Sequence, residues 1–249
     1  MNRKTVICSV LLACLLLSAC AEDKKEIITV EGVKQAAAEP SPSPSPAPTA
    51  APETPAPAEE PSPAPEKEKP LLGVYSAEKY KYTNDFFSLS FSAGEDWVFV
   101  KKAELADLMK INLDQYEEDV RELIKSEGAA YDMAASSVDG MKTCNVIVQR
   151  VPANYDLSQD ITELLNTNAA GMPAGMREAG YGNVECSVGT VKTGGKEIPC
   201  LYTTADYSGL PYYCRQVFVL SGNYMAVVTA ASFNADFTEE IMNMFTIEN

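Results

Sequence analysis

The second half of the chain alternates between hydrophobic and polar residues in four consecutive runs. The runs are VECSVGTV (184–191), EIPCLYTT (197–204), YCRQVFVL (213–220) and YMAVVTAAS (224–232). The segments KTGGK, ADYSGLP and SGN separate them and are rich in the residue types that favour tight turns. The pattern therefore predicts a meander of four antiparallel strands.

Shorter alternating runs upstream predict two further strand pairs. FFSLSF (86–91) and DWVFVKK (96–102) flank the turn-like SAGE, and YDMAASSV (131–138) and CNVIVQRV (144–151) are joined through Asp139-Gly140. An Asp-Gly pair between hydrophobic runs is a strong hairpin signal. We expect two hairpins here.

Three segments have hydrophobic residues at helical spacing instead. LDQYEEDVRELIKSEG (113–128) carries an apolar stripe and an acidic face. DLSQDITELLNTNAAGM (156–172) has Asp156 or Ser158 near its N-cap, and Pro173 should end or kink it. FTEEIMNMF (237–245) predicts a closing helix. The order hairpin, helix, hairpin, helix, meander, helix indicates an α+β fold, an antiparallel β-sheet sandwiched between helices.

Several of these segments resemble the PsbP-like domains of bacterial lipoproteins. The resemblance covers most of residues 75–247 and rests on the order of elements and on Phe86, Phe91, Trp97, Gly140 and Asn145. It implies an antiparallel sheet between helices and an extracytoplasmic accessory or binding role without catalysis. No functional residue carries over from the family.

The first twenty residues read as a lipoprotein signal. Arg3 and Lys4 precede the apolar run Val6–Ala19, which is too short to span a bilayer, and Leu17-Ser18-Ala19-Cys20 resembles the bacterial lipobox. The resemblance implies cleavage after residue 19 and lipidation of Cys20. We therefore expect anchoring on the extracytoplasmic face of the cell membrane.

Residues 39–70 contain twelve of the sixteen prolines of the chain. Proline fixes φ and donates no hydrogen bond, so the segment favours extended polyproline II and builds no core. We predict a signal peptide over 1–19, a lipidated, Pro-rich, disordered tether over 20–70 and one α+β domain over 71–249. A disordered segment without a spacer role would have the same composition.

Charge and composition exclude several kinds of function. The segment from residue 71 onward has 13 lysine and arginine residues against 25 aspartate and glutamate residues, a net charge of −12. Such a surface repels nucleic acid and anionic lipid. The chain has no histidine, which excludes the common Ser–His and Cys–His nucleophiles and most zinc or copper sites. We predict no cofactor and no metal.

Four cysteines, Cys144, Cys186, Cys200 and Cys214, remain after the signal and the lipidation site are set aside. All four lie in predicted strands. They are either reduced core thiols or include one disulfide, and Cys200–Cys214 is the candidate because a turn near Tyr207 would bring their strands together.

Four tyrosines surround the same turn and form our candidate interaction surface: Tyr202, Tyr207, Tyr212 and Tyr213. Tyrosines are frequent anchors of protein interfaces. Cross-strand aromatic pairs that stabilise the hairpin are the alternative.

The hypothesis from the sequence is a non-enzymatic, membrane-anchored lipoprotein whose domain is a binding or accessory module for an envelope protein or complex. The alternative is binding of a small extracytoplasmic ligand or cation. A Ser/Lys hydrolase ranks third, because Ser76-x-x-Lys79 and Lys192-Thr-Gly match fragments of the penicillin-binding signature but lack its middle element in the right order.

Overall fold

The computed structural model describes residues 69–76, 79–111, 113, 116, 120–151 and 161–248. The proposed lipidation site Cys20, most of the Pro-rich segment and the predicted capping residues Asp156 and Ser158 lie outside these residues. They stay predictions.

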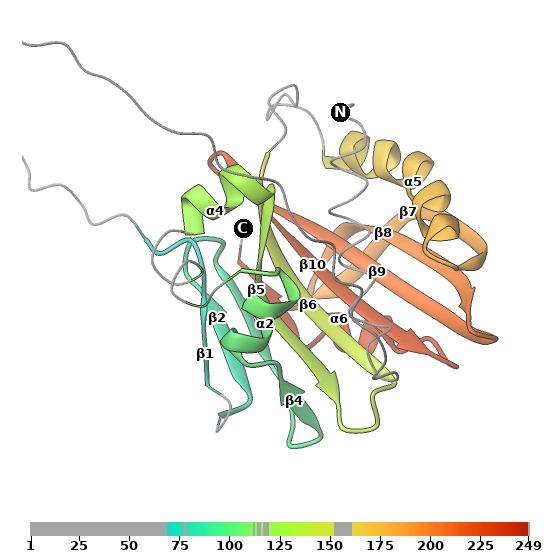
Figure 1. The fold of residues 1–249 in the computed structure, drawn as a ribbon. Coiled ribbons are helices and arrows are strands. Elements are labelled where there is room, and N and C mark those ends of the chain that lie inside the picture. Colours follow the sequence, from blue (N-terminus) through green and yellow to red (C-terminus); the bar gives the residue numbers. More distant parts are fainter. Residues whose placement is uncertain are drawn as a thin grey trace, which may run out of the picture. The chain divides into compact units, whose positions relative to one another are not determined.

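A seven-stranded antiparallel sheet forms the centre of the domain (Figure 1). Its spatial order is β4 (Trp97–Phe99), β5 (Ala129–Ser137), β6 (Lys142–Arg150), β10 (Tyr224–Phe233), β9 (Leu210–Ser221), β8 (Lys196–Tyr207) and β7 (Gly182–Thr193). The predicted meander and the hairpin through Asp139-Gly140 are confirmed. The meander strands β7 to β9 have 12 residues each and β10 has 10.

A second, four-stranded sheet consists of β1 (Val74–Ser76), β2 (Lys81–Asn84), β3 (Leu89–Ser92) and β11 (Phe245–Ile247). The predicted strand over 86–91 starts at Leu89, because Asn84 Oδ1 accepts the Phe87 N–H and Ser88 adopts a positive φ in the preceding turn. The predicted hairpin between 86–91 and 96–102 is wrong, because β3 pairs with β2 and β11 in this sheet, whereas β4 pairs with β5 in the other. The closing helix is also shorter than predicted.

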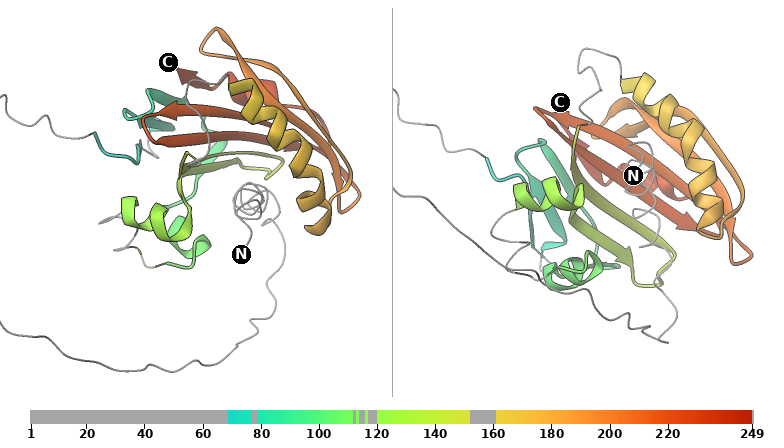
Figure 2. Two further views of the ribbon diagram at one scale, coloured as in Figure 1. Left: turned by 90° about the horizontal axis from the view of Figure 1, so that it is seen from above. Right: turned by 45° about the horizontal axis from the view of Figure 1, so that its top comes forward.

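Helices α2 (Lys102–Leu108) and α4 (Val120–Glu127) pack on β5 and β6, and α5 (Ile161–Glu178) packs on β7 and β8. The views in Figure 2 show these helices on one face of the large sheet. The small sheet and α6 (Thr238–Met242) lie on the opposite face. The α+β fold is thus as predicted, but a second sheet shares the far face with one short helix.

Hydrophobic packing explains where the closing helix ends. Ile241 and Met242 of α6 are fully buried, and the chain then reverses into β11 so that Phe245 pairs with Phe91. Their ring centroids are 4.6 Å apart. Aromatic contacts of this kind stabilise beyond the area they bury, and they draw Phe245 into a strand instead of a last helical turn.

Helix α5 continues through Pro173 to Glu178, so of the two outcomes predicted for this proline, a helix end or a kink, the helix end is wrong. Met172 and Met176 lie on either side of Pro173 and are buried against the sheet together with Leu165. This packing outweighs the hydrogen bond that proline cannot donate.

A buried carboxylate connects the two sheets. Asp132 is the extra residue of a β-bulge in β5 and accepts hydrogen bonds from the Gly73 N–H (2.7 Å), the Tyr82 hydroxyl (2.5 Å) and the Asn84 amide (2.7 Å). Burial raises the pKa of Asp132 to about 6, although the three hydrogen bonds oppose the shift. This cluster fixes Gly73, and with it the start of the folded domain.

Candidate functional site

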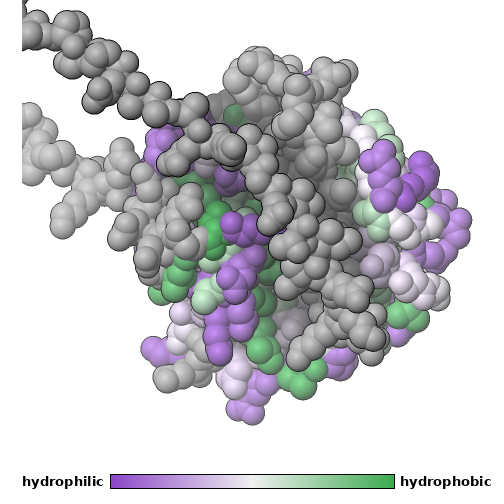
Figure 3. Space-filling view, in the orientation of Figure 1, coloured by the Kyte–Doolittle hydropathy of each residue, from purple (hydrophilic) through white to green (hydrophobic). Residues whose placement is uncertain are grey.

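Exposed hydrophobic side chains gather at one end of the seven-stranded sheet. Of the eight large hydrophobic residues that are exposed in the described part of the chain, five lie at this end: Val98, Val138, Met141, Leu210 and Phe237. Val138 is the most exposed, at 71%. We call these five residues and the turns that carry them the loop edge. In Figure 3, hydrophobic surface is visible at the lower end of the domain.

Strand register and backbone hydrogen bonds bring these residues together from distant parts of the sequence. The Val138 N–H donates to Asp96 O (2.8 Å), which connects the β5–β6 turn to the start of β4. The Phe233 N–H donates to Met141 O (3.0 Å), and the Asn234 N–H donates to Pro211 O (2.9 Å). The β5–β6 turn, the β10–α6 loop and the start of β9 therefore form one continuous edge.

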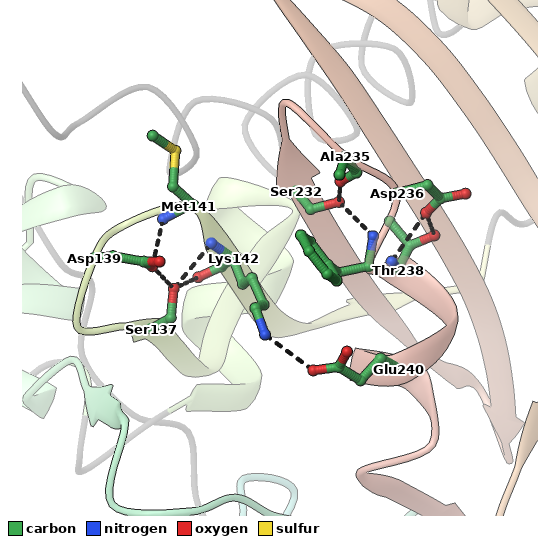
Figure 4. Close-up of polar contacts among 10 residues, drawn as sticks. Ser137, Asp139, Met141, Lys142, Ser232, Ala235, Asp236, Thr238 and Glu240 are labelled. Carbon is green, nitrogen blue, oxygen red and sulfur yellow. Dashed lines mark hydrogen bonds and ion pairs between the residues drawn. The ribbon is translucent and has the colours of Figure 1, made fainter.

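The β5–β6 turn is held by a side-chain network that Figure 4 shows. The Ser137 hydroxyl donates to Asp139 Oδ1 (2.5 Å), which also accepts the Met141 N–H (3.0 Å), and the Lys142 N–H donates to Ser137 Oγ (3.0 Å). The hydrogen bond from Ser137 holds the pKa of the Asp139 carboxyl below its usual range. Val138 and Met141 thus project from a turn with fixed geometry.

A matching network holds the start of α6, where Figure 4 shows the contacts of Ser232, Ala235, Asp236 and Thr238. The Phe237 N–H donates to Ser232 Oγ (3.0 Å), and the Ser232 hydroxyl donates to Ala235 O (2.9 Å). Lys142 Nζ lies 4.7 Å from the centre of the Phe237 ring and 2.9 Å from Glu240 Oε1. These two contacts of Lys142 join the network of the β5–β6 turn to the network at the start of α6.

Tyr202 is the predicted tyrosine that contacts the β10–α6 loop. Its hydroxyl donates to Asp236 Oδ2 (2.9 Å), and the Arg215 guanidinium lies 4.4 Å from its ring centre and 3.6 Å from the same carboxylate. Burial, followed by the Asp236 contact, raises the pKa of Tyr202 to about 12. Burial opposes ionisation of Asp236, but hydrogen bonds from Thr238 and Tyr202 outweigh it and hold its pKa below the usual range.

The four tyrosines do not form one surface. Tyr202 and Tyr213 are half-buried on the α6 face, whereas Tyr212 is fully buried under α5, and the ring centroid of Tyr207 lies 4.6 Å from that of Tyr181 on that face. Strand alternation explains the division, because neighbours in a strand point to opposite faces. The sequence does contain one signal for the loop edge, namely the large hydrophobic residues in the VDGM turn. Large apolar side chains are unusual in a tight hairpin turn.

All four cysteines from residue 144 onward are free thiols, so the structure does not contain the Cys200–Cys214 bridge. The β8–β9 register pairs Cys214 with Thr203, three positions from Cys200. The odd offset directs the two side chains to opposite faces, and they belong to different hydrophobic clusters. A bridge would therefore need a different register.

The Lys192-Thr-Gly fragment of the penicillin-binding signature belongs to a hairpin turn. Lys192 and Thr193 end β7, and Gly194 and Gly195 form a two-residue hairpin turn with positive φ, as expected from the KTGG pattern. Among the described residues, no three acidic or cysteine side chains are grouped as a metal site requires. No helix in the described part of the chain is long and apolar enough to cross a bilayer.

No protein-family model matches the chain, and no curated protein matches it in sequence. Two of the solved structures that match part of the chain illustrate how distant these likenesses are. LpqN of Mycobacterium tuberculosis, a protein involved in cell envelope biogenesis, has a TM-score of 0.35 and 11% identity over 64% of this chain and 83% of its own. A protein from Bacteroides thetaiotaomicron has a TM-score of 0.36 and 12% identity over 68% of this chain and 48% of its own. Likenesses this distant carry no functional information for this chain.

Proposed function

We propose that this chain is a bacterial lipoprotein, anchored through lipidated Cys20 on the extracytoplasmic face of the cell membrane. We further propose that its PsbP-like α+β domain is a non-catalytic binding or accessory module for an envelope protein. The observation that carries the binding role is the gathering of five exposed hydrophobic side chains on the pre-arranged loop edge. A cluster of exposed hydrophobic side chains that is bordered by polar residues is typical of protein interaction sites.

The chemistry of the domain supports binding over catalysis. The chain has no histidine, and the one buried carboxylate of the described residues, Asp132, is enclosed by three hydrogen-bond donors. A general acid or base must reach its substrate, and a carboxylate enclosed in this way does not.

Metabolic labelling with palmitate tests the anchor. We expect label on the full-length protein and its loss in a Cys20→Ser variant, which should also leave the membrane fraction, since stable anchoring needs acyl chains. Cys186→Ser keeps the lipobox intact and is the control. Labelling that persists in Cys20→Ser would contradict the anchor.

Chemical cross-linking on intact cells, followed by mass spectrometry, tests the binding role. We expect a dominant protein neighbour that is lost when the folded domain is deleted but residues 1–68 are kept. Neighbours that are unchanged by this deletion would contradict a stable protein partner. A concentration-dependent rise in melting temperature with a small ligand or cation would instead favour the alternative function.

A further inference from the structure

We propose that the loop edge binds a protein surface with an apolar centre and a basic border, at the end of the domain away from the tether. The inference rests on the proposed function and adds to it the location of the interface and the chemistry of the partner. Charge, position and rigidity of the edge each support it.

The loop edge is acidic around its hydrophobic residues. Two cations among these residues are neutralised, because Lys142 pairs with Glu240 (2.9 Å) and Arg215 pairs with Asp236 (3.6 Å). Four carboxylates next to the hydrophobic positions form no ion pair with any described residue: Glu95, Asp96, Asp139 and Glu239. A partner that covers the hydrophobic residues would therefore face surplus negative charge.

This charge pattern favours a basic protein over a lipid surface. Anionic lipid head groups attract lysine and arginine and repel carboxylates. A protein that presents lysine or arginine around an apolar centre is complementary in both respects, and such complementarity selects partners and speeds association. The partner chemistry that fits the edge is thus a basic, partly apolar protein surface.

The edge lies far from the point where the tether joins the domain. Lys69 Nζ donates to Asp85 O (3.3 Å), and the turn that follows Asp85 contacts the β9–β10 turn through Phe86 and Ser221. β10 runs from that turn to the loop edge over 10 residues, which corresponds to about 30 Å of extended chain. In Figure 1 the described chain begins at the upper left, and the turns of the loop edge lie toward the bottom and right. The loop edge and the first described residues therefore lie at opposite ends of β10.

The edge is also ordered before any partner binds. Val138, Met141 and Phe237 are carried by loops whose backbone N–H groups are bonded to Asp96, Asp139 and Ser232. Pre-arranged side chains lose less conformational entropy on binding, so more of the contact energy appears as affinity.

Site-specific photo-cross-linking with the full-length protein on intact cells tests the location. One variant carries the photoreactive residue in place of Val138 and the other in place of Val74, which is equally exposed (71% and 70%) but lies on β1 near the tether. We expect a discrete protein adduct from position 138 and at least about tenfold less of it from position 74, because the reactive group must lie within contact distance of the partner. Equal adducts at both positions, or lipid adducts alone at position 138, would overturn the inference.

Charge reversal tests the partner chemistry. Glu95→Lys adds a positive charge next to Asp96, whose carbonyl accepts the Val138 N–H, without breaking any hydrogen bond or ion pair between described residues. We expect it to reduce the adduct at position 138 by about threefold or more. Glu127→Lys, at the exposed end of α4 and the opposite end of β5, is the matched control and should leave the yield unchanged. If Glu95→Lys melts at the same temperature as the parent protein, an unchanged adduct yield at position 138 would overturn the proposed basic border of the partner.

The failures of the two proposals are distinguishable. A partner that depends on the folded domain but is captured from position 74 and not from position 138 would leave the proposed function standing and overturn the loop edge as its site. Neighbours that do not depend on the folded domain would overturn both.

Discussion

Asp132 is the only charged side chain that is fully buried in the described part of the chain. Its three partners are all donors, so the site favours a carboxylate, yet removal from water favours the neutral acid. Burial is the larger effect here and raises the pKa. The residue that holds the first folded segment, through Gly73, is therefore sensitive to pH.

Folding raises the pKa of Asp132 from 3.8 to about 6. Between these two pH values the folded state holds a proton that the unfolded chain has released. Protonated Asp132 therefore contributes stability that is fully present below pH 3.8 and is lost as the pH rises through 6. The loss amounts to about 3 kcal/mol. Asp132→Asn lacks this pH-dependent contribution. Its free energy of unfolding, measured with denaturant between pH 4 and pH 8, should therefore decline less with rising pH than that of the parent protein.

Asp107→Asn, which replaces an exposed carboxylate on α2, is the control for this measurement and should follow the parent curve. Parallel curves for the parent protein and Asp132→Asn would show that Asp132 does not titrate in this range, and would contradict the prediction.

The four thiols should be nearly inert in the folded protein. Burial raises the pKa of Cys214 to about 12 and raises the pKa values of the Cys144, Cys186 and Cys200 thiols as well. Only the thiolate attacks alkylating reagents. We expect peptide mapping after iodoacetamide treatment at pH 8 to show slow labelling of half-buried Cys186 alone, and labelling of all four in denaturant. Rapid native labelling of Cys200 or Cys214, or a disulfide-linked peptide, would contradict this.

At the scale of elements, α5 contains two residues that weaken a helix. Pro173 cannot donate to Ala169 O, and Gly171 has open space where a Cβ would be. Proline costs about 3 kcal/mol relative to alanine inside a helix, and glycine about 1 kcal/mol. The unfolded state recovers part of this difference, since proline also restricts the unfolded chain.

Pro173→Ala should therefore raise the free energy of unfolding by about 1–2 kcal/mol. Gly171→Ala is the comparison and should raise it by about 0.5–1 kcal/mol. Chemical denaturation of both variants checks the order. A destabilised Pro173→Ala variant would mean that proline is needed for the packing of Met172 and Met176.

The elements that could be predicted from the sequence are those whose pattern is local. The four meander strands and the Asp139-Gly140 hairpin follow from alternation and turn residues, and the structure has them within a few residues. The strand β11, the start of β3 at Leu89 and the passage of α5 through Pro173 depend on tertiary contacts, namely Phe245 with Phe91 and Met176 with the sheet. Local propensity does not contain this information.

The loop edge shows the same limit for the candidate site. Val98, Val138 and Phe237 are separated by up to 139 positions, and only the register of β4, β5, β6 and β10 brings them to one end of the sheet. The four tyrosines between residues 202 and 213 are close in sequence, which suggests a single surface. The alternation of side chains along each β-strand instead places them on the two faces of the sheet. Which residues share a surface therefore depends on the order of the strands in the sheet, and the sequence pattern did not determine that order.

At the scale of the whole molecule, the proposed anchor, tether and loop edge make one arrangement for reaching a distant partner. If residues 39–68 adopt polyproline II, these thirty residues span about 90 Å, whereas a Gly/Ser chain of equal length has a mean extension of about 30 Å. The effective concentration of the edge at a partner depends on this reach. The prolines, and not merely the length of the segment, should then matter for binding.

We therefore expect replacement of residues 39–68 by a Gly/Ser repeat of equal length to lower the photo-cross-linking yield from position 138 by about threefold or more. A repeat of Ala-Pro of the same length preserves the extension and should keep the parental yield, which separates stiffness from sequence. Both variants should melt at the parental temperature, because the replaced residues precede the segment held by Asp132. An undiminished yield in the Gly/Ser variant would show that the partner lies within reach of a flexible chain, and the proline content would then need a different explanation from spacing.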